Sequence, residues 1–159
     1  MGTKPNKNLE RSLLALKDIP CNVVVVGPLS EAQQALIDSL GISYINKTSL
    51  SFEKVISCYK QADIVCFPST YEGFGMPIIE AQTVGRVVLS SNIGATKEIA
   101  GTGAHLVDPY SVDAIREGIL KIMKDPVYRD RLIEKGFTNA AKYSLEHTVE
   151  SYVSLYNEF

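Results

Sequence analysis

Two glutamates flank a glycine-rich turn near the middle of this 159-residue chain. Glu72 lies in the turn, and Glu80 follows on a stretch typical of an apolar helix. The first backbone N–H groups of a helix have no partner within the helix and favour anions, so the turn 73–76 can form a phosphate cradle. A carboxylate at the position of Glu80 can accept hydrogen bonds from ribose hydroxyls. We therefore expect a ligand that combines phosphate and sugar.

Each of these residues also has a purely structural interpretation. A Gly-x-Gly sequence before a helix often forms only a turn, and the helix dipole stabilises a carboxylate such as Glu72 without any ligand. Glu80 on its own is compatible with an ordinary solvent-facing position. Lys7 follows Pro5-Asn6 in a loop at the same predicted face and is the strongest basic candidate. Considered alone, Lys7 is better explained by simple solvation.

The overall composition limits the classes of function. With 45% hydrophobic and 21% charged residues, the chain can bury one substantial core, and we expect a single domain spanning residues 1–159. A net charge of -2 and a pI of about 5.7 give no electrostatic basis for binding nucleic acid. No apolar run approaches the ~20 residues of a membrane span, and the sequence has no signal peptide. These features predict a cytoplasmic protein.

The cysteines and histidines carry no recognisable chemistry. Cys21, Cys58 and Cys66 have no C-x-x-C spacing, which predicts reduced, buried thiols and not disulfides or zinc ligands. His105 and His147 lack a serine, cysteine or carboxylate partner at an evident spacing, so we interpret both as structural. No cluster has the spacing of metal ligands. We therefore expect no metal site.

Strand and helix patterns alternate along the chain. The continuous β-branched run at 22–27 is typical of a strand buried on both faces of a parallel sheet. Further strands are expected at 43–46, 64–67, 87–90 and 104–107, and helices at 9–17, 30–40, 51–61, 77–84, 96–100, 111–124, 126–143 and 145–157. This alternation predicts an α/β fold with a doubly wound, Rossmann-like parallel sheet flanked by helices and a helical C-terminus. Ligands of such sheets bind beyond the carboxyl ends of the strands.

The chain opens on a loop with no strand before it, which predicts a part of a larger protein. In the strand order 3-2-1-4-5-6 the first strand is central, so without it the 23–26 and 64–67 strands have unpaired edges. These edges must close, admit water or recruit another chain. A second unpartnered surface is the apolar stripe of the last helix, formed by Val149, Tyr152, Val153 and Tyr156. We expect self-association or altered packing at one of these two surfaces.

The segment Glu72–Ala81 resembles the E-x7-E segment of retaining glycosyltransferase family 4, which lies in the C-terminal domain of the GT-B fold. Other segments resemble motifs of that family in the same order along the chain. They are 2–9 (G-T-x-x-P-R-K-N-L), 23–27 (a strand ending in V-G), 62–69 (A-D-x-x-x-x-P-S), 94–99 (G-A-x-x-E-I) and 103–109 (G-x-L-V-x-P). The ordered series covers nearly the whole chain and is more specific than any one motif.

The resemblance implies a role for each matching residue. Lys7 would contact the donor diphosphate and stabilise charge on the leaving group, and Glu72 would lie beside the donor sugar. Glu80 would bind the nucleotide ribose. Asn6 stands where many relatives carry arginine, which leaves one positive charge fewer for the diphosphate. Backbone amides near the phosphates or sugar would come from Gly73, Phe74, Gly75 and Met76.

The resemblance also implies where the nucleotide and the other substrate bind. Gly27 and Pro28 would line the nucleotide cleft, and Tyr44 and Ile45 would flank the base. The active site of a GT-B enzyme lies between two such domains, and the N-terminal, acceptor-binding domain is not part of this chain. We therefore expect a donor-binding domain that uses a nucleotide diphosphate-sugar, requires no metal or other cofactor, and is inactive as an isolated fragment. Peripheral contact with the inner membrane face through the other domain is compatible with this expectation.

Two other functions remain open at this point. The chain could be a non-catalytic nucleotide-binding or regulatory module that keeps the fold, or a sugar-nucleotide epimerase of the same architecture. The presence of Lys7 together with Glu72 and Glu80 favours transfer over a degenerate module.

Overall fold

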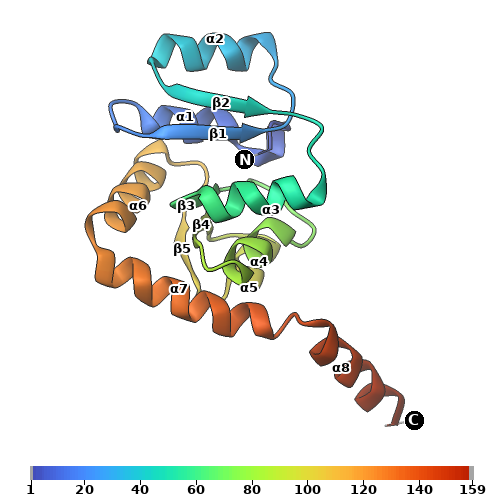
Figure 1. Cartoon of the computed structure of the whole chain (residues 1–159). Coiled ribbons are helices and arrows are strands. Elements are labelled where there is room, and N and C mark those ends of the chain that lie inside the picture. Colours follow the sequence, from blue (N-terminus) through green and yellow to red (C-terminus); the bar gives the residue numbers. More distant parts are fainter. Residues whose placement is uncertain (1, 158–159) are drawn as a thin grey trace.

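The computed structural model describes residues 2–157, in which five strands alternate with helices (Figure 1). The strands are β1 (Asn22–Val26), β2 (Ser43–Lys47), β3 (Ile64–Phe67), β4 (Val87–Ser91) and β5 (Ala104–Val107). The helices are η1 (Pro5–Lys7, a 3-10 turn), α1 (Leu9–Leu16), α2 (Glu31–Leu40), α3 (Phe52–Gln61), α4 (Met76–Thr83), α5 (Gly94–Ala100), α6 (Val112–Lys124), α7 (Pro126–Ala141) and α8 (Leu145–Asn157). The predicted α/β fold is confirmed.

The five strands form two parallel sheets, one with the order β1-β2 and one with the order β3-β4-β5. In the first sheet Val24 pairs with Ile45, and in the second Val65 pairs with Val88 and Val88 with Ala104. Within residues 2–157, β1 and β3 each have only one hydrogen-bonded neighbour. The two edges that the sequence analysis expects to be unpaired, one on β1 and one on β3, carry no strand pairing in the described residues.

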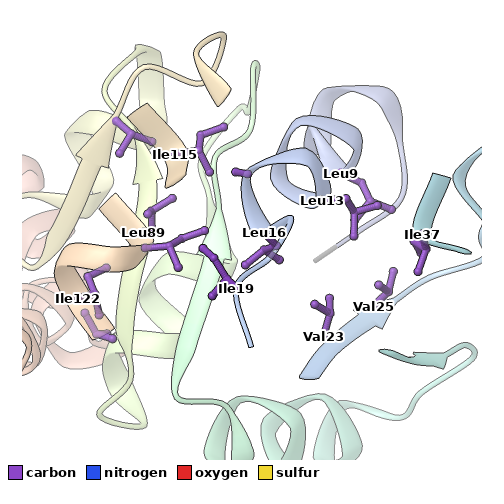
Figure 2. Close-up of a cluster of buried hydrophobic side chains, with 14 of the residues drawn as sticks. Leu9, Leu13, Leu16, Ile19, Val23, Val25, Ile37, Leu89, Ile115 and Ile122 are labelled. Carbon is purple, nitrogen blue, oxygen red and sulfur yellow. The ribbon is translucent and has the colours of Figure 1, made fainter. Parts of the chain in front are cut away.

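One cluster of buried side chains connects the two sheets although they share no backbone pairing in the described residues. Figure 2 shows Leu16 and Ile19 between the side chains of β1, such as Val23, and those of β4 and α6, such as Leu89 and Ile122. Burial of each such aliphatic side chain contributes roughly 1.5–3 kcal/mol. Side-chain packing therefore contributes to holding the β1-β2 sheet against the rest of the domain.

The helix ends lie within two residues of the expected ranges, with the largest differences at the start of α5 (Gly94) and the end of α7 (Ala141). Ser30 caps α2 through its hydroxyl, which accepts from the Gln33 amide at 3.2 Å, and Gly41 ends the helix with a φ of 63°. The sequence pattern places Pro77 at the first position of the next helix. In the structure Gly75 is the cap and Met76 the first residue, so Pro77 is second. Proline is acceptable there because N–H groups of the first turn have no partner within the helix.

A cavity of about 630 Å³ lies between β1 and β3, and we call it the inter-sheet cavity. Its lining includes Cys21, Cys58 and Cys66. Each cysteine borders this cavity and is half-buried as a residue, so the expectation of buried thiols is wrong for Cys21 and Cys58, whereas burial raises the pKa of the Cys66 thiol to about 11. All three thiols are free, as predicted. The unpaired edges of β1 and β3 thus remain apart and enclose space.

The last helix extends away from the body of the domain (Figure 1). Val149, Tyr152, Val153 and Tyr156 on α8 are all more than half exposed, so the predicted apolar stripe has no cover. Self-association through this stripe or through the inter-sheet cavity stays a prediction. Among residues 2–157, no helix combines the length and the apolar character needed to cross a membrane.

Candidate functional site

The centre of the candidate site is an ion pair between two residues far apart in sequence. Lys7 at the end of η1 places its Nζ 2.6 Å from Oε1 of Glu72. Both side chains are largely shielded, with exposed fractions of 22% for Lys7 and 12% for Glu72. The Lys7 ammonium also lies 5.0 Å from the centre of the Phe67 ring. This cation is held at the carboxyl end of β3, where Phe67 is the last residue.

Hydrogen bonds fix the N-terminal segment to the loop that carries Glu72. The Asn6 side-chain amide donates to the carbonyl of Tyr71 at 2.9 Å and reaches Oε1 of Glu72 at 3.5 Å, while the Thr70 amide donates to the carbonyl of Asn6 at 2.8 Å. Asn6, where the family resemblance implies arginine, is thus an uncharged residue that orders the Glu72 loop. Lys7 supplies the positive charge.

Asn8 connects this segment to two other loops at the same edge of the sheet. Its buried side-chain amide donates to the carbonyls of Pro68 at 2.9 Å and Pro109 at 2.7 Å, which follow β3 and β5. Its φ of 59° lies in the left-handed region that asparagine tolerates better than most residues. Asn8 therefore ends η1, begins α1 and holds Lys7 above the sheet.

The glycine-rich turn presents the N-terminus of α4. Gly75 caps the helix with a φ of 110°, and a Cβ at this position would lie 3.2 Å from Cδ1 of Ile78. Gly73, Phe74 and Met76 are exposed, and the Phe74 ring packs edge-on against Tyr143 with 5.8 Å between ring centres. Pro77 has no N–H, and the Ile78 N–H donates to the Gly75 carbonyl at 2.9 Å, so the first turn leaves the Met76 N–H, together with the helix dipole, to favour an anion at this end of α4.

Glu80, in the second turn of α4, has a partner that sequence reasoning missed. The Tyr59 hydroxyl of α3 donates to Oε2 of Glu80 at 2.8 Å. Burial, and then the hydrogen bond to Glu80, raise the pKa of Tyr59 well above its ordinary value, so the phenol stays protonated. The helical spacing of α3 placed Tyr59 on the apolar face, and no local pattern pairs it with a residue 21 positions away.

The remaining predicted site residues lie on or after β1 and β2. Gly27 follows β1 with a φ of 130°, and a Cβ there would approach Oγ1 of Thr3 to 3.0 Å. Pro28 is exposed beside it. Tyr44 and Ile45 lie in the middle of β2, where the Tyr44 hydroxyl contacts Gln34 of α2 and Ile45 is 56% exposed. Among the described residues, no hydrogen bond or ion pair joins Tyr44 or Ile45 to Lys7 or Glu72.

The histidines and the acidic residues form no second centre. Nδ1 of His105 lies 2.7 Å from the Tyr128 hydroxyl, and burial together with nearby Lys121 lowers the pKa of His105. His147 lies on exposed α8 with Nδ1 3.9 Å from Glu150. In the part of the chain that the structure describes, no three His, Cys, Asp or Glu side chains form a group that could hold a metal ion.

The sequence profile of the family "Glycosyl transferases group 1" matches residues 3–138. Over 98 residues the chain is 35% identical to the O-antigen chain mannosyltransferase B of Escherichia coli, covering 62% of this chain and 26% of that protein. Over 148 residues it is 30% identical to the MMP alpha-(1->4)-mannosyltransferase of Mycolicibacterium hassiacum, covering 89% of this chain and 36% of that protein. The chain thus spans about a third or less of the length of these two relatives.

Solved structures share the fold. The C-terminal domain of a glycosyl transferase group 1 family protein from Francisella tularensis superposes with a TM-score of 0.76 at 24% identity, covering 91% of this chain and 84% of that one. The Anabaena protein HepE, in complex with UDP and glucose, superposes with a TM-score of 0.79 at 16% identity, covering all of this chain and 47% of that one. The family match spans most of the chain, from Thr3 to Thr138. The chain therefore belongs to the glycosyl transferases group 1 family.

Proposed function

We propose that this chain is the donor-binding domain of a retaining glycosyltransferase that moves a sugar from a nucleotide diphosphate-sugar to an acceptor. The observation that carries the proposal is the shielded Lys7–Glu72 pair beside the glycine-rich N-terminus of α4. A structure of the same fold in complex with UDP and glucose supports the choice of ligand.

Each residue of the site is assigned to the part of the ligand that its chemistry suits. The Lys7 ammonium has three donors, so it can stay paired with Glu72 while it contacts a diphosphate. The backbone amides of the turn before Pro77, at Gly73, Phe74, Gly75 and Met76, provide further donors for phosphate oxygens. Glu80, oriented by Tyr59, keeps Oε1 free of any partner among the described residues and can accept from a ribose hydroxyl. We assign Glu72 to the sugar that is attached to the diphosphate, because it is paired with Lys7.

The chemical step of such an enzyme releases a nucleoside diphosphate, so negative charge develops on the phosphate oxygens as the sugar leaves. A lysine and preorganised N–H groups stabilise that charge without moving during the reaction. This arrangement does not require a divalent metal. The acceptor would bind to a separate N-terminal domain, so the 159-residue chain alone is expected to form no transfer product from a sugar nucleotide.

Calorimetry with UDP, GDP and ADP tests the proposal. We expect saturable heat and a higher melting temperature with at least one of the three. The matched nucleoside monophosphate serves as the control and should bind more weakly, because Lys7 and the turn amides lose a phosphate. Neither heat nor a thermal shift with any of the three diphosphates would overturn the proposal.

A further inference from the structure

The glycine-rich turn does not use its own backbone amides to hold its shape. Among the described residues, no backbone carbonyl accepts a hydrogen bond from the amides of residues 73–76. The nearest amides with such an acceptor are those of Thr70, which donates to Asn6, and Ile78, which donates to Gly75. A turn that offers its amides to a ligand cannot also pair them internally, so its shape depends on side-chain contacts.

Side-chain contacts hold the turn at its start, its middle and its end. At the start Glu72 pairs with Lys7 at 2.6 Å, and at the end the side chain of Ile78 is fully buried. In the middle the Phe74 ring meets the Tyr143 ring edge-on, with 5.8 Å between the ring centres and 89° between the ring planes. Phe74 is 42% exposed, so the rest of its surface has little cover. The Tyr143 ring therefore restrains the middle of the turn.

The end of α7, which packs against α4, holds Tyr143 in place (Figure 1). The Tyr143 amide donates to the Ala140 carbonyl at 3.0 Å, and its side chain packs against the buried cluster that α4 shares with α5 and the β3-β4-β5 sheet. One helical turn earlier, the buried side-chain amide of Asn139 donates to Oε1 of Gln82 at 2.9 Å and to the Ile99 carbonyl at 2.7 Å. Residues four positions apart lie on the same face of a helix. The end of α7 thus contacts the last turn of α4 through Asn139 and the turn before α4 through Tyr143.

We propose that Tyr143 is a positioning residue, which holds the turn 73–76 through the Phe74 ring in the shape that presents its amides to a diphosphate. This inference rests on the proposed function, which assigns a diphosphate to the turn. Loss of the ring contact loosens these amides without removing any of them. Glu80 is unaffected, because it lies within α4 and is bound by the Tyr59 hydroxyl at 2.8 Å. Binding of the diphosphate therefore depends on Tyr143, and binding of the ribose does not.

Backbone order parameters measured by NMR on the ligand-free chain test the contact itself. At the amides of residues 73–75 they should be near the rigid value of about 0.85 in wild type and fall below about 0.6 in Tyr143→Ala. Tyr143→Phe keeps the ring and should match wild type. Tyr128→Ala is the matched control, because it removes another edge-on ring pair of α7, with His105 at 5.7 Å between ring centres, from the first turn of that helix. It should leave residues 73–75 unchanged.

Calorimetry tests the consequence for binding, with whichever of UDP, GDP and ADP wild type binds and with its parent nucleoside. Tyr143→Ala should weaken the diphosphate about three- to tenfold and leave the nucleoside unchanged. Phe74→Ala removes the same contact from the exposed side, so it should have the same effect even if Tyr143→Ala is too unstable to study. The double variant should be no weaker than either single one, because a single contact is lost in all three. Tyr143→Phe and Tyr128→Ala should bind both ligands like wild type.

The two measurements separate the role of Tyr143 from the proposed function. If wild type binds none of the three diphosphates, the proposed function is wrong, and the order parameters still decide whether Tyr143 holds the turn. Order parameters at 73–75 that are the same in Phe74→Ala, Tyr143→Ala and wild type would overturn the positioning role. A loosened turn with unchanged diphosphate affinity would also overturn it. Equal weakening of diphosphate and nucleoside would do the same, because a general loss of structure affects both ligands.

Discussion

The two sheets differ in how completely their strands are covered. Every residue of β4 is buried between β3 and β5, whereas no residue of β2 is fully buried and two of five in β1 are. The Lys7–Glu72 pair and the start of α4 lie over the carboxyl end of β3 in the well-packed sheet. Gly27 and Pro28 follow β1, on the other side of the inter-sheet cavity.

This difference indicates that the two halves of the domain are held in place to different degrees. The half that carries the Lys7–Glu72 pair is the more tightly packed of the two, because it is built on a three-stranded sheet with helices packed against it. The half that would line the nucleotide cleft depends on side-chain contacts with α1 and α6, so its position relative to Lys7 is the less constrained of the two. We therefore expect substitutions in the two halves to have unequal effects on stability and on nucleotide binding.

Matched valine substitutions give the largest expected contrast in stability. Val88 in β4 is fully buried, whereas Val24 in β1 is 38% exposed at the cavity. Val88→Ala leaves a void among close-packed neighbours and should lower the free energy of unfolding by about 2–3 kcal/mol, against about 0.5 kcal/mol for Val24→Ala. Urea unfolding measures both values. Equal losses would show that the β1-β2 sheet is packed as tightly as the other.

Asn8→Ala should act on the connection between the two halves. The substitution removes two buried hydrogen bonds and leaves the carbonyls of Pro68 and Pro109 without this donor, at about 1–3 kcal/mol. Asn6→Ala is the matched control, because its hydrogen bond to Tyr71 is exposed. If the control destabilises the chain as much as Asn8→Ala, the buried hydrogen bonds of Asn8 contribute no more to stability than the exposed hydrogen bond of Asn6.

Tyr59→Phe should weaken nucleotide binding without unfolding the protein. Loss of one hydrogen bond to Glu80 corresponds to about 0.5–1.5 kcal/mol, or roughly a three- to tenfold loss of affinity for a nucleoside diphosphate. An analogue without ribose hydroxyls is the control ligand and should bind wild type and variant equally. Equal losses for both ligands would mean that Tyr59 does not act through Glu80 and the ribose.

The smallest expected effect concerns pH. Burial and Lys121 lower the pKa of His105 in the folded state, so the unfolded state binds its proton more readily. The stability that neutral His105 contributes is complete above its unfolded pKa of about 6.5 and is lost as pH falls below that value. The unfolding free energy of wild type minus that of His105→Gln should decline from pH 7 to pH 5. A difference that is flat or rises toward pH 5 would contradict this sign.

Local patterns predict the elements but not the contacts between them. The bounds of β3, β5 and α8 match the expected ranges, because apolar runs and flanking turn residues determine them locally. The Lys7–Glu72 contact joins residues 65 positions apart, and the sequence analysis did not predict it, because the family resemblance gave each residue its own role toward the donor without pairing the two. Nothing local pairs Tyr59 with Glu80, or reveals that the cysteines border a cavity, since both depend on how α3 and the two sheets pack together.

Calorimetry of a nucleoside diphosphate and its parent nucleoside, with wild type, Lys7→Ala and Glu80→Ala, tests the proposed site most directly. If Lys7 binds the diphosphate and Glu80 the ribose, Lys7→Ala should weaken the diphosphate at least tenfold and leave the nucleoside unchanged, because charge-assisted hydrogen bonds contribute about 1.5–3 kcal/mol. Glu80→Ala should weaken both ligands by a similar factor. Unchanged affinity of the diphosphate for Lys7→Ala and Glu80→Ala would contradict the assignment of this site.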